Sequence, residues 1–179
     1  MAPLDDELIP LLNQPGAGWL DALMVLAGDR IALFALGAGA AAYVALKTPS
    51  RWVGAVALLL SIIAADQLAG RALEPWVKRV RPCAAEVHRT VAPKDCPPGH
   101  SFPSRQSAAA AAGALVFSAA APVLSGIAIF ATLLVGASRV YLGESYPSDV
   151  AAGLLVGAAV GAALLSVSKL RFFHPKHWT

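Results

Sequence analysis

Five long apolar segments dominate this chain of 179 residues and limit how it can fold. They cover residues 31–46, 52–73, 106–120, 122–137 and 150–168. An α-helix needs about 20 predominantly apolar residues to cross the hydrocarbon core of a bilayer. We therefore expect the shorter segments to extend into the residues that flank them. The pattern predicts an all-α integral membrane protein, built as a bundle of five to six helices.

The composition and the ends of the chain agree with this architecture. Charged residues form 14% of the chain, whereas a soluble domain has about 25%. No linker divides the sequence, so residues 1–179 are expected to form one domain with its core bundle over 31–168.

Residues 1–29, interrupted by Pro10 and Pro15, predict an amphipathic helix at the membrane interface. The tail, 169–179, is basic, which favours the cytoplasm.

Three glycines in the last apolar segment, Gly153, Gly157 and Gly161, are spaced four residues apart. Residues at this spacing lie on the same face of a helix. Small residues on one face let two helices approach closely inside a bilayer. The spacing predicts a close contact between this helix and a neighbour.

The charge balance indicates lipid rather than nucleic acid as the partner. The formal net charge is +3, and no basic stripe interleaved with aromatic residues is present. A small positive excess suits the anionic head groups of a lipid bilayer. The four histidines are His88, His100, His174 and His177, and the close pair lies in the basic tail, away from the other two. The sequence therefore predicts neither a metal site nor a cofactor.

One long polar connection, residues 74–105, is rich in proline and separates two of the apolar segments. It holds the only two cysteines of the chain, Cys83 and Cys96. They are either two separate thiols or a disulfide, and a disulfide requires an oxidising compartment. We expect this loop to lie outside the cytoplasm, on the periplasmic side of a bacterial inner membrane.

Three arginines, Arg81, Arg105 and Arg139, each stand where a loop meets an apolar segment. Because successive spanning helices alternate in direction, these three junctions lie on one side of the membrane. Arginine presents a rigid fork of donors that matches phosphate oxygens. The arrangement predicts a site for a phosphorylated lipid head group. The alternative is that each arginine only anchors the end of its helix at the interface.

Three segments, residues 74–82, 101–107 and 138–149, carry the polar residues of this side. In order and spacing they resemble the three motifs of the type 2 phosphatidic acid phosphatase family of membrane lipid phosphatases. The resemblance extends from about residue 31 to residue 168. The residues that fit are Asp66, Arg81, Pro82, Phe102, Pro103, Ser104, Ser138, Arg139, Tyr141, Gly143, Pro147 and Asp149.

The resemblance also assigns roles. It implies that Arg81, Ser104 and Arg139 bind phosphate and that Asp149 orients the nucleophile. The four departures fall on the remaining functional positions. The family lysine is Glu74, the glycine of the second motif is Arg105, and the two catalytic histidines are Gln106 and Ser145.

These departures weaken the chemistry that the resemblance implies. Glutamine cannot supply a proton to a leaving group, and a serine nucleophile needs a nearby base. For Ser145 that base would be Asp149 or Glu144.

The leading hypothesis is a protein that binds a phosphorylated lipid, phosphatidate-like or polyprenyl phosphate or diphosphate, with histidine-based hydrolysis absent or strongly weakened. One alternative is a divergent phosphatase or phosphotransferase that uses Ser145 or the loop residue His100. Another is a structural membrane subunit.

Overall fold

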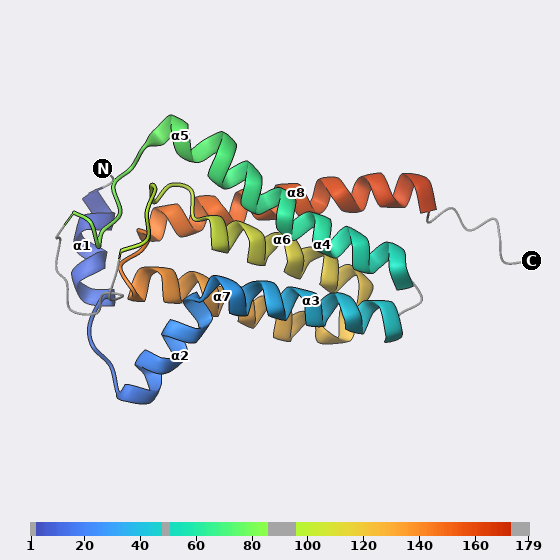
Figure 1. The fold of residues 1–179 in the computed structure, drawn as a ribbon, viewed down its shortest axis with the longest axis horizontal. Coiled ribbons are helices and arrows are strands. Elements are labelled where there is room, and N and C mark those ends of the chain that lie inside the picture. Colours follow the sequence, from blue (N-terminus) through green and yellow to red (C-terminus); the bar gives the residue numbers. More distant parts are fainter. Residues whose placement is uncertain (1–2, 48–50, 86–95, 173–179) are drawn as a thin grey trace, which may run out of the picture.

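The computed structural model describes residues 3–47, 51–85 and 96–172, and within these ranges the chain is helical and forms no strand. The prediction of an all-α fold is confirmed (Figure 1). The elements are α1 (Pro3–Leu12), α2 (Gly18–Gly28), α3 (Arg30–Lys47), α4 (Arg51–Gln67), the π-helical segment η1 (Leu68–Leu73), α5 (Glu74–Val77), α6 (Arg105–Ala120), the 3-10 turn η2 (Pro122–Leu124), α7 (Ser125–Tyr141) and α8 (Pro147–Phe172).

Helix α6 forms the centre of the bundle. It packs against α8, α4, α7 and α3, and Figure 1 shows these helices running along the long axis of the molecule. Its buried face consists mainly of small residues, with Ala108, Ala109 and Ala112 almost completely enclosed. Small side chains let neighbouring helices approach α6 closely on several sides. This explains how α6, a helix of 16 residues, occupies the centre of the bundle.

The contact between α6 and α8 follows the three glycines of α8. A Cβ atom on Gly153 would strike the backbone oxygen of Ser104, and one on Gly157 would strike that of Ala108. At Gly161 a Cβ atom would lie 3.1 Å from the oxygen of Ala112. The predicted close-packing face is therefore directed at the backbone of α6.

Four helical stretches among the described residues are long and apolar enough to cross a membrane. They are Arg30–Lys47, Trp52–Val77, Pro122–Tyr141 and Pro147–Val167. Helix α6, predicted as a fifth span, is helical but shorter than these four. The chain is an integral membrane protein, as its sequence predicts.

Two boundaries of the predicted loop are wrong. Helix α4 continues without a break through η1 and α5, so Glu74 lies in a helix and not in the loop. Pro75 stands at the start of α5, directly after the π-helical segment η1. At the other end Arg105 already belongs to α6. The connection therefore covers residues 78–104, of which 86–95 lie outside the described residues.

The two ends of the chain also differ from the expectation. The N-terminal segment folds as two helices, and Pro10 lies inside α1 rather than ending it. At the other end, α8 runs on to Phe172, so the first residues of the predicted tail are helical. Residues 173–179 lie outside the described residues.

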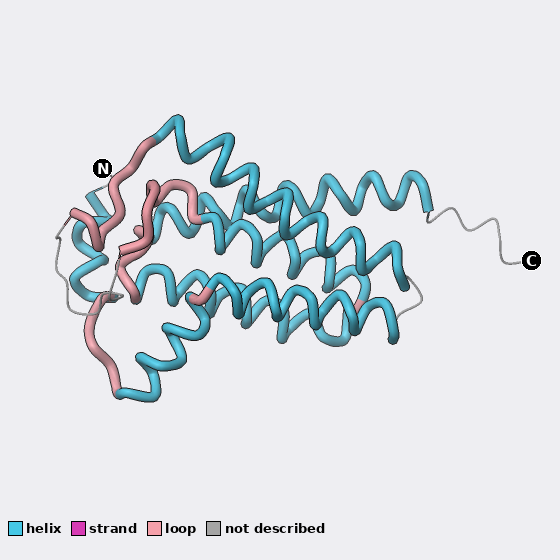
Figure 2. The backbone as a smooth tube through the Cα atoms, viewed as in Figure 1, coloured by secondary structure: helices cyan, strands magenta, loops and turns pink. Residues whose placement is uncertain are grey.

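The connections that carry the three motifs gather at one end of the bundle, beside α1 (Figure 2). At this end α3 and α8 begin and α7 ends. Helix ends are positions where a chain inside a membrane protein can place charged side chains next to water. The fold thus concentrates the polar residues in one place.

We expect Gly157→Ala to lower the free energy of unfolding by about 1–3 kcal/mol, because overpacking forces the α6 and α8 backbones apart. Thermal unfolding in detergent measures this as a fall in the midpoint temperature. Gly126→Ala is the matched control, since a Cβ atom at Gly126 meets nothing within 4 Å. Equal midpoints for the two variants would contradict the assigned contact.

Candidate functional site

A polar cavity of about 480 Å³ opens at the end of the bundle where the motifs meet. Its walls come from α3, α4, α6, α7, both described parts of the long loop and the turn before α8. The lining residues are Gly28, Asp29, Arg30, Asp66, Arg81, Pro97, Pro98, His100, Ser101, Pro103, Ser104, Arg105, Gln106, Arg139, Glu144 and Ser145. Four arginines thus line one open cavity.

Arg81, from the loop after α5, is 9% exposed. Its Nη1 donates a hydrogen bond of 2.8 Å to the backbone oxygen of Glu144. Its Nε is buried and has no hydrogen-bond partner among the described residues. Burial lowers the pKa of the Arg81 guanidinium, with the charge of Glu74 opposing this and that of Arg105 adding to it. Among the described residues, the Arg81 guanidinium therefore keeps one buried donor without an acceptor, which is costly.

Arg139, near the end of α7, is also buried. It forms an ion pair with the Glu144 carboxylate and donates from Nη1 to the backbone oxygen of Gly28 at 3.0 Å. The same Gly28 oxygen accepts a hydrogen bond of 2.9 Å from Nε2 of Gln106. Arg139 and Gln106 are therefore fixed to the same point at the end of α2.

Arg105 and Arg30 share one carboxylate. Their Nη2 atoms lie 2.8 Å and 2.9 Å from Oδ2 of Asp66, and that oxygen also accepts a bond of 3.0 Å from Gln67. The Arg105 guanidinium passes directly over Gly70 in η1, where a Cβ atom would collide with it. The π-helical turn and its glycine thus make room for an arginine at the mouth of the cavity.

Ser104 and Ser145 supply two buried hydroxyl groups to the lining. Ser104 precedes α6, and its hydroxyl lies 2.9 Å from that of Ser107. Its backbone N–H donates to the oxygen of Asp149 at 3.0 Å, which ties the second motif to the third. The backbone N–H of Ser145 donates to the oxygen of Arg139 at 3.1 Å.

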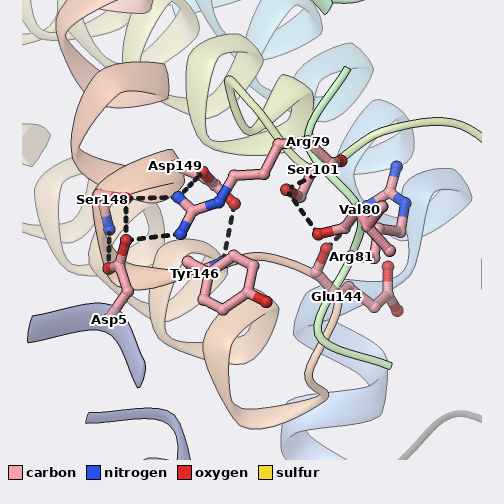
Figure 3. Close-up of polar contacts among 9 residues, drawn as sticks. All are labelled: Asp5, Arg79, Val80, Arg81, Ser101, Glu144, Tyr146, Ser148 and Asp149. Carbon is pink, nitrogen blue, oxygen red and sulfur yellow. Dashed lines mark hydrogen bonds and ion pairs between the residues drawn. The ribbon is translucent and has the colours of Figure 1, made fainter. Parts of the chain in front are cut away.

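Asp149 is held on the other side of the loop by Arg79 (Figure 3). Its Oδ1 lies 2.7 Å from Nη1 of Arg79, and its Oδ2 accepts a bond of 2.9 Å from the backbone N–H of Tyr146. The guanidinium of Arg79 stacks 3.8 Å from the centre of the Tyr146 ring. Both carboxylate oxygens of Asp149 are therefore engaged by donors other than the Ser145 hydroxyl.

The same arginine connects Asp149 to the N-terminal helix. Nη2 of Arg79 lies 2.8 Å from the carboxylate of Asp5 in α1. Asp5 also accepts bonds from the backbone N–H of Ser148 at 3.1 Å and from its hydroxyl at 2.5 Å. We call the group Asp5, Arg79, Ser148 and Asp149 the Arg79 clamp.

Glu74 is turned toward the loop and not into the cavity. Its Oε1 accepts a bond of 2.5 Å from the backbone N–H of His100, and a Cβ atom on Gly99 would lie 2.6 Å from that oxygen. Gly99 has a φ of +95°, a conformation that favours glycine. A disulfide joins Cys83 to Cys96, with 5.8 Å between their Cα atoms. Together these contacts hold residues 96–101 over the cavity.

Most residues predicted for the site do meet. Arg81, Ser104, Arg105 and Arg139 line the cavity together with Gln106 and Ser145. Glu74 and Asp149 are not among the residues that line the cavity.

His100, which alone among the four histidines lies within the described residues, lines the cavity although its loop position gave no strong sign of this. Sequence reasoning missed Arg30 and Arg79, because their importance depends on partners far away in the chain. It named Glu144 only as a possible base for Ser145, whereas the structure pairs Glu144 with Arg139.

An apolar helical bundle with buried arginines and serines around a cavity at its end defines a membrane protein with an arginine-lined cavity. The chain belongs to the PAP2 superfamily, whose family model matches residues 54–173. The resemblance of its motifs to the type 2 phosphatidic acid phosphatase family is thereby confirmed.

Solved structures are similar over nearly the whole chain. One is a transmembrane PAP2 type phosphatidylglycerolphosphate phosphatase from Bacillus subtilis, with a TM-score of 0.71 and 26% identity over 94% of this chain and 87% of the other. Another is Aquifex aeolicus LpxE, with a TM-score of 0.72 and 27% identity over 89% and 93%.

Two curated relatives match a shorter part of the sequence. They are the decaprenylphosphoryl-5-phosphoribose phosphatases of two Mycobacterium tuberculosis strains, 36% identical over 91 residues. The match covers 51% of this chain and 49% of each relative, so the chain spans about half the length of the curated relatives it matches.

The Arg79 clamp makes the stability of the fold depend on pH in the acidic range. Burial acts to raise the pKa of Asp5, but hydrogen bonds from Ser148 and Arg79 outweigh it and lower the pKa below its ordinary value. A carboxylate with a lowered folded-state pKa stabilises the fold above its unfolded pKa of about 3.9. That stability is lost as the pH falls through the lower folded-state pKa.

We therefore expect the melting temperature of the unmodified protein to fall more steeply than that of Asp5→Asn between about pH 5 and pH 2. Asp5→Asn should also be less stable near pH 7, where the ionised clamp is complete. Glu7→Gln, an exposed change on the same helix, is the control. Parallel pH curves for the unmodified protein and Asp5→Asn would show that Asp5 does not hold Arg79.

Proposed function

We propose that this protein binds a phosphorylated lipid, with the phosphoryl group in the polar cavity between Arg81, Ser104 and Arg139. The observation that carries the proposal is that two buried arginines, Arg81 and Arg139, line one cavity together with the buried Ser104. Charge-assisted bonds to phosphate are stronger than bonds between neutral groups. An anionic oxygen is therefore the acceptor best suited to complete this site.

An apolar cavity beside the polar one supports a lipid as the source of that phosphate. It has a volume of about 440 Å³ and lies between α3, α4, α6 and α7. Its wall begins about one helical turn from the polar cavity, at Leu33 in α3, Ala109 in α6 and Val135 in α7. We propose that the hydrocarbon chain of the same lipid occupies this space, because a free phosphate has no apolar part that could fill it.

The positions of Gln106 and Ser145 support binding rather than turnover by histidine chemistry. Gln106 uses its amide to hold the backbone of Gly28 and has no proton to exchange near neutral pH. The two carboxylates proposed as bases for Ser145 are engaged elsewhere, Glu144 with Arg139 and Asp149 with Arg79. We infer that hydrolysis by the route of the family is absent or strongly weakened.

The relatives agree with this class of ligand. One is named for phosphatidylglycerolphosphate and another for a phosphorylated decaprenyl compound, and both names describe a phosphorylated lipid. We propose the same class for this chain, phosphatidate-like or polyprenyl phosphate or diphosphate. The disulfide between Cys83 and Cys96 supports a cavity that faces the periplasmic side of a bacterial inner membrane, where disulfides persist.

A second candidate function rests on one observation. His100 and Ser145 line the same cavity, which defines an alternative. In it the Ser145 hydroxyl passes its proton to His100 and attacks phosphorus, the bond from phosphorus to the lipid oxygen breaks, and His100 protonates that leaving oxygen. Water then hydrolyses the phosphoserine and releases phosphate. Release of phosphate that disappears in Ser145→Ala would favour this candidate over binding alone.

We expect Arg81→Ala to weaken binding of a lipid phosphate by about tenfold or more, as removal of a charge-assisted bond costs about 1.5–3 kcal/mol. Glu144→Gln should strengthen binding, because it frees Arg139 from its carboxylate partner. The measurement is titration of purified protein with a short-chain prenyl phosphate. Arg71→Ala, at an exposed position outside the cavity wall, is the control. Unchanged affinity in Arg81→Ala would exclude the proposed site.

We expect the unmodified protein to release little phosphate from phosphatidic acid, phosphatidylglycerol phosphate or a polyprenyl diphosphate. A variant that combines Glu74→Lys, Arg105→Gly, Gln106→His and Ser145→His should gain hydrolysis, because these changes restore the family pattern at every departure. Phosphate release in detergent measures this, and the melting temperature establishes that the variant folds. A folded variant without any gain would refute the assignment of these positions to the family motifs.

A further inference from the structure

We propose that Arg79 is a positioning residue for the phosphate site: its side chain, held between α1 and α8, fixes residues 79–81 so that Arg81 lines the cavity. The inference rests on the proposed function, because it names the residue that places one of the phosphate-binding side chains. Arg79 itself is not among the residues that line the cavity. It therefore acts through Arg81 and not by touching the ligand.

The segment that carries Arg81 has no regular secondary structure. Helix α5 ends at Val77, Lys78 has a φ of +50°, and residues 79–81 are neither helix nor strand. A segment without a helix or a strand ladder depends on individual contacts to stay in place. The position of Arg81 is therefore determined by the contacts of its neighbours as well as its own.

The Arg79 guanidinium joins two helices from opposite ends of the chain. Its Nη1 lies 2.7 Å from Asp149 and 2.8 Å from the hydroxyl of Ser148, both in α8, and its Nη2 lies 2.8 Å from Asp5 in α1. The ring of Tyr146 covers the guanidinium at 3.8 Å. An arginine that only balanced the charge of Asp149 would need no second carboxylate from another helix.

The backbone of Arg79 holds a further part of the cavity wall. Its oxygen accepts hydrogen bonds from the N–H of Ser101 at 2.9 Å and from the hydroxyl of Ser101 at 3.3 Å, and Ser101 lines the cavity. Figure 3 shows the Arg79 side chain extending toward Asp149, while Arg81 lies on the other side of the segment, beside Glu144. Arg79 thus connects the helix contacts to two positions of the wall, Ser101 and Arg81.

Helix α1 is itself fixed, so it can hold Arg79 firmly. Asp5 and Ile9 lie on one face of α1, Asn13 follows at the same spacing of four, and each is at most 2% exposed. Ile9 shares an apolar cluster with Val140, and Nδ2 of Asn13 donates to the backbone oxygen of Tyr141 at 2.7 Å. The carboxylate of Asp5 therefore comes from a helix that is attached to the third motif at two further points.

Arg79→Lys tests this role, because it keeps the charge but replaces the planar fork that reaches both carboxylates with a single ammonium group. We expect the affinity for a short-chain prenyl phosphate, measured by calorimetric titration, to fall about fivefold or more. In an Arg81→Ala background the same change should cost less than about twofold, since the side chain that Arg79 positions is gone. Lys78→Arg, the reverse exchange at the exposed neighbouring position, is the matched control and should leave the affinity unchanged.

A second measurement reports the position of Arg81 without any ligand. Phenylglyoxal modifies accessible arginines, and mass spectrometry of the peptides gives the rate at each one. Arg81 is buried, so it should react slowly in the unmodified protein and several times faster in Arg79→Lys. Asp5→Asn, which removes one of the two carboxylates that hold Arg79, should act in the same direction. Arg139, which α7 carries and Glu144 pairs, should react slowly in every variant.

The melting temperature of each variant establishes that it folds, and Asp5→Asn takes the place of Arg79→Lys in the titrations if the latter does not. An unchanged affinity, or equal losses of affinity with and without the Arg81 side chain, would overturn the positioning role. So would an unchanged rate of modification at Arg81 in both variants.

Failure of the positioning role and failure of the proposed function give different results. If the prenyl phosphate binds and Arg81→Ala weakens it, but the variants of the clamp leave the affinity and the modification of Arg81 unchanged, the lipid-phosphate site stands and the role of Arg79 is wrong. If the prenyl phosphate does not bind the unmodified protein, the proposed function is wrong. The modification rates then decide by themselves whether Arg79 positions Arg81.

Discussion

The contact between α6 and α8 is the constraint on which the site depends. The glycines of α8 let its backbone lie directly against that of α6, and at the end of this contact Ser104 donates its backbone N–H to Asp149. The second and third motifs are thereby fixed to each other. Because helices in a bilayer associate through packing rather than exclusion of water, this close approach determines where the polar ends of the bundle meet.

Buried charge then decides how the polar end is organised. Taking a guanidinium out of water is expensive unless acceptors surround it, and Arg139 meets this requirement with Glu144 and Gly28. Asp149 is neutralised by Arg79, which also reaches Asp5 in α1. The Nε atoms of Arg81 and Arg105 stay buried and without a hydrogen-bond partner among the described residues. The site is thus defined as much by which arginines are already paired as by where arginines occur.

The sequence predicted the parts of this arrangement that depend on local pattern. Apolar segments indicated the helices, and the positions of Arg81, Arg105 and Arg139 at helix ends indicated a shared polar side. It did not predict the pairing of side chains, since Arg79 and Asp149 are 70 residues apart and either could have had other partners. Nor did apolar length predict that the helix continues past residue 73, because α5 begins with Glu74 and Pro75.

The central claim is that a phosphorylated lipid binds intact between Arg81, Ser104 and Arg139. A structure of the unmodified protein after long incubation with a prenyl phosphate tests it most directly. The account predicts density for an uncleaved phosphate ester at these three residues, with the hydrocarbon chain in the apolar cavity between α3 and α7. Density for a phosphate bonded to Ser145, for free phosphate without its lipid, or for a lipid phosphate outside the cavity would contradict it.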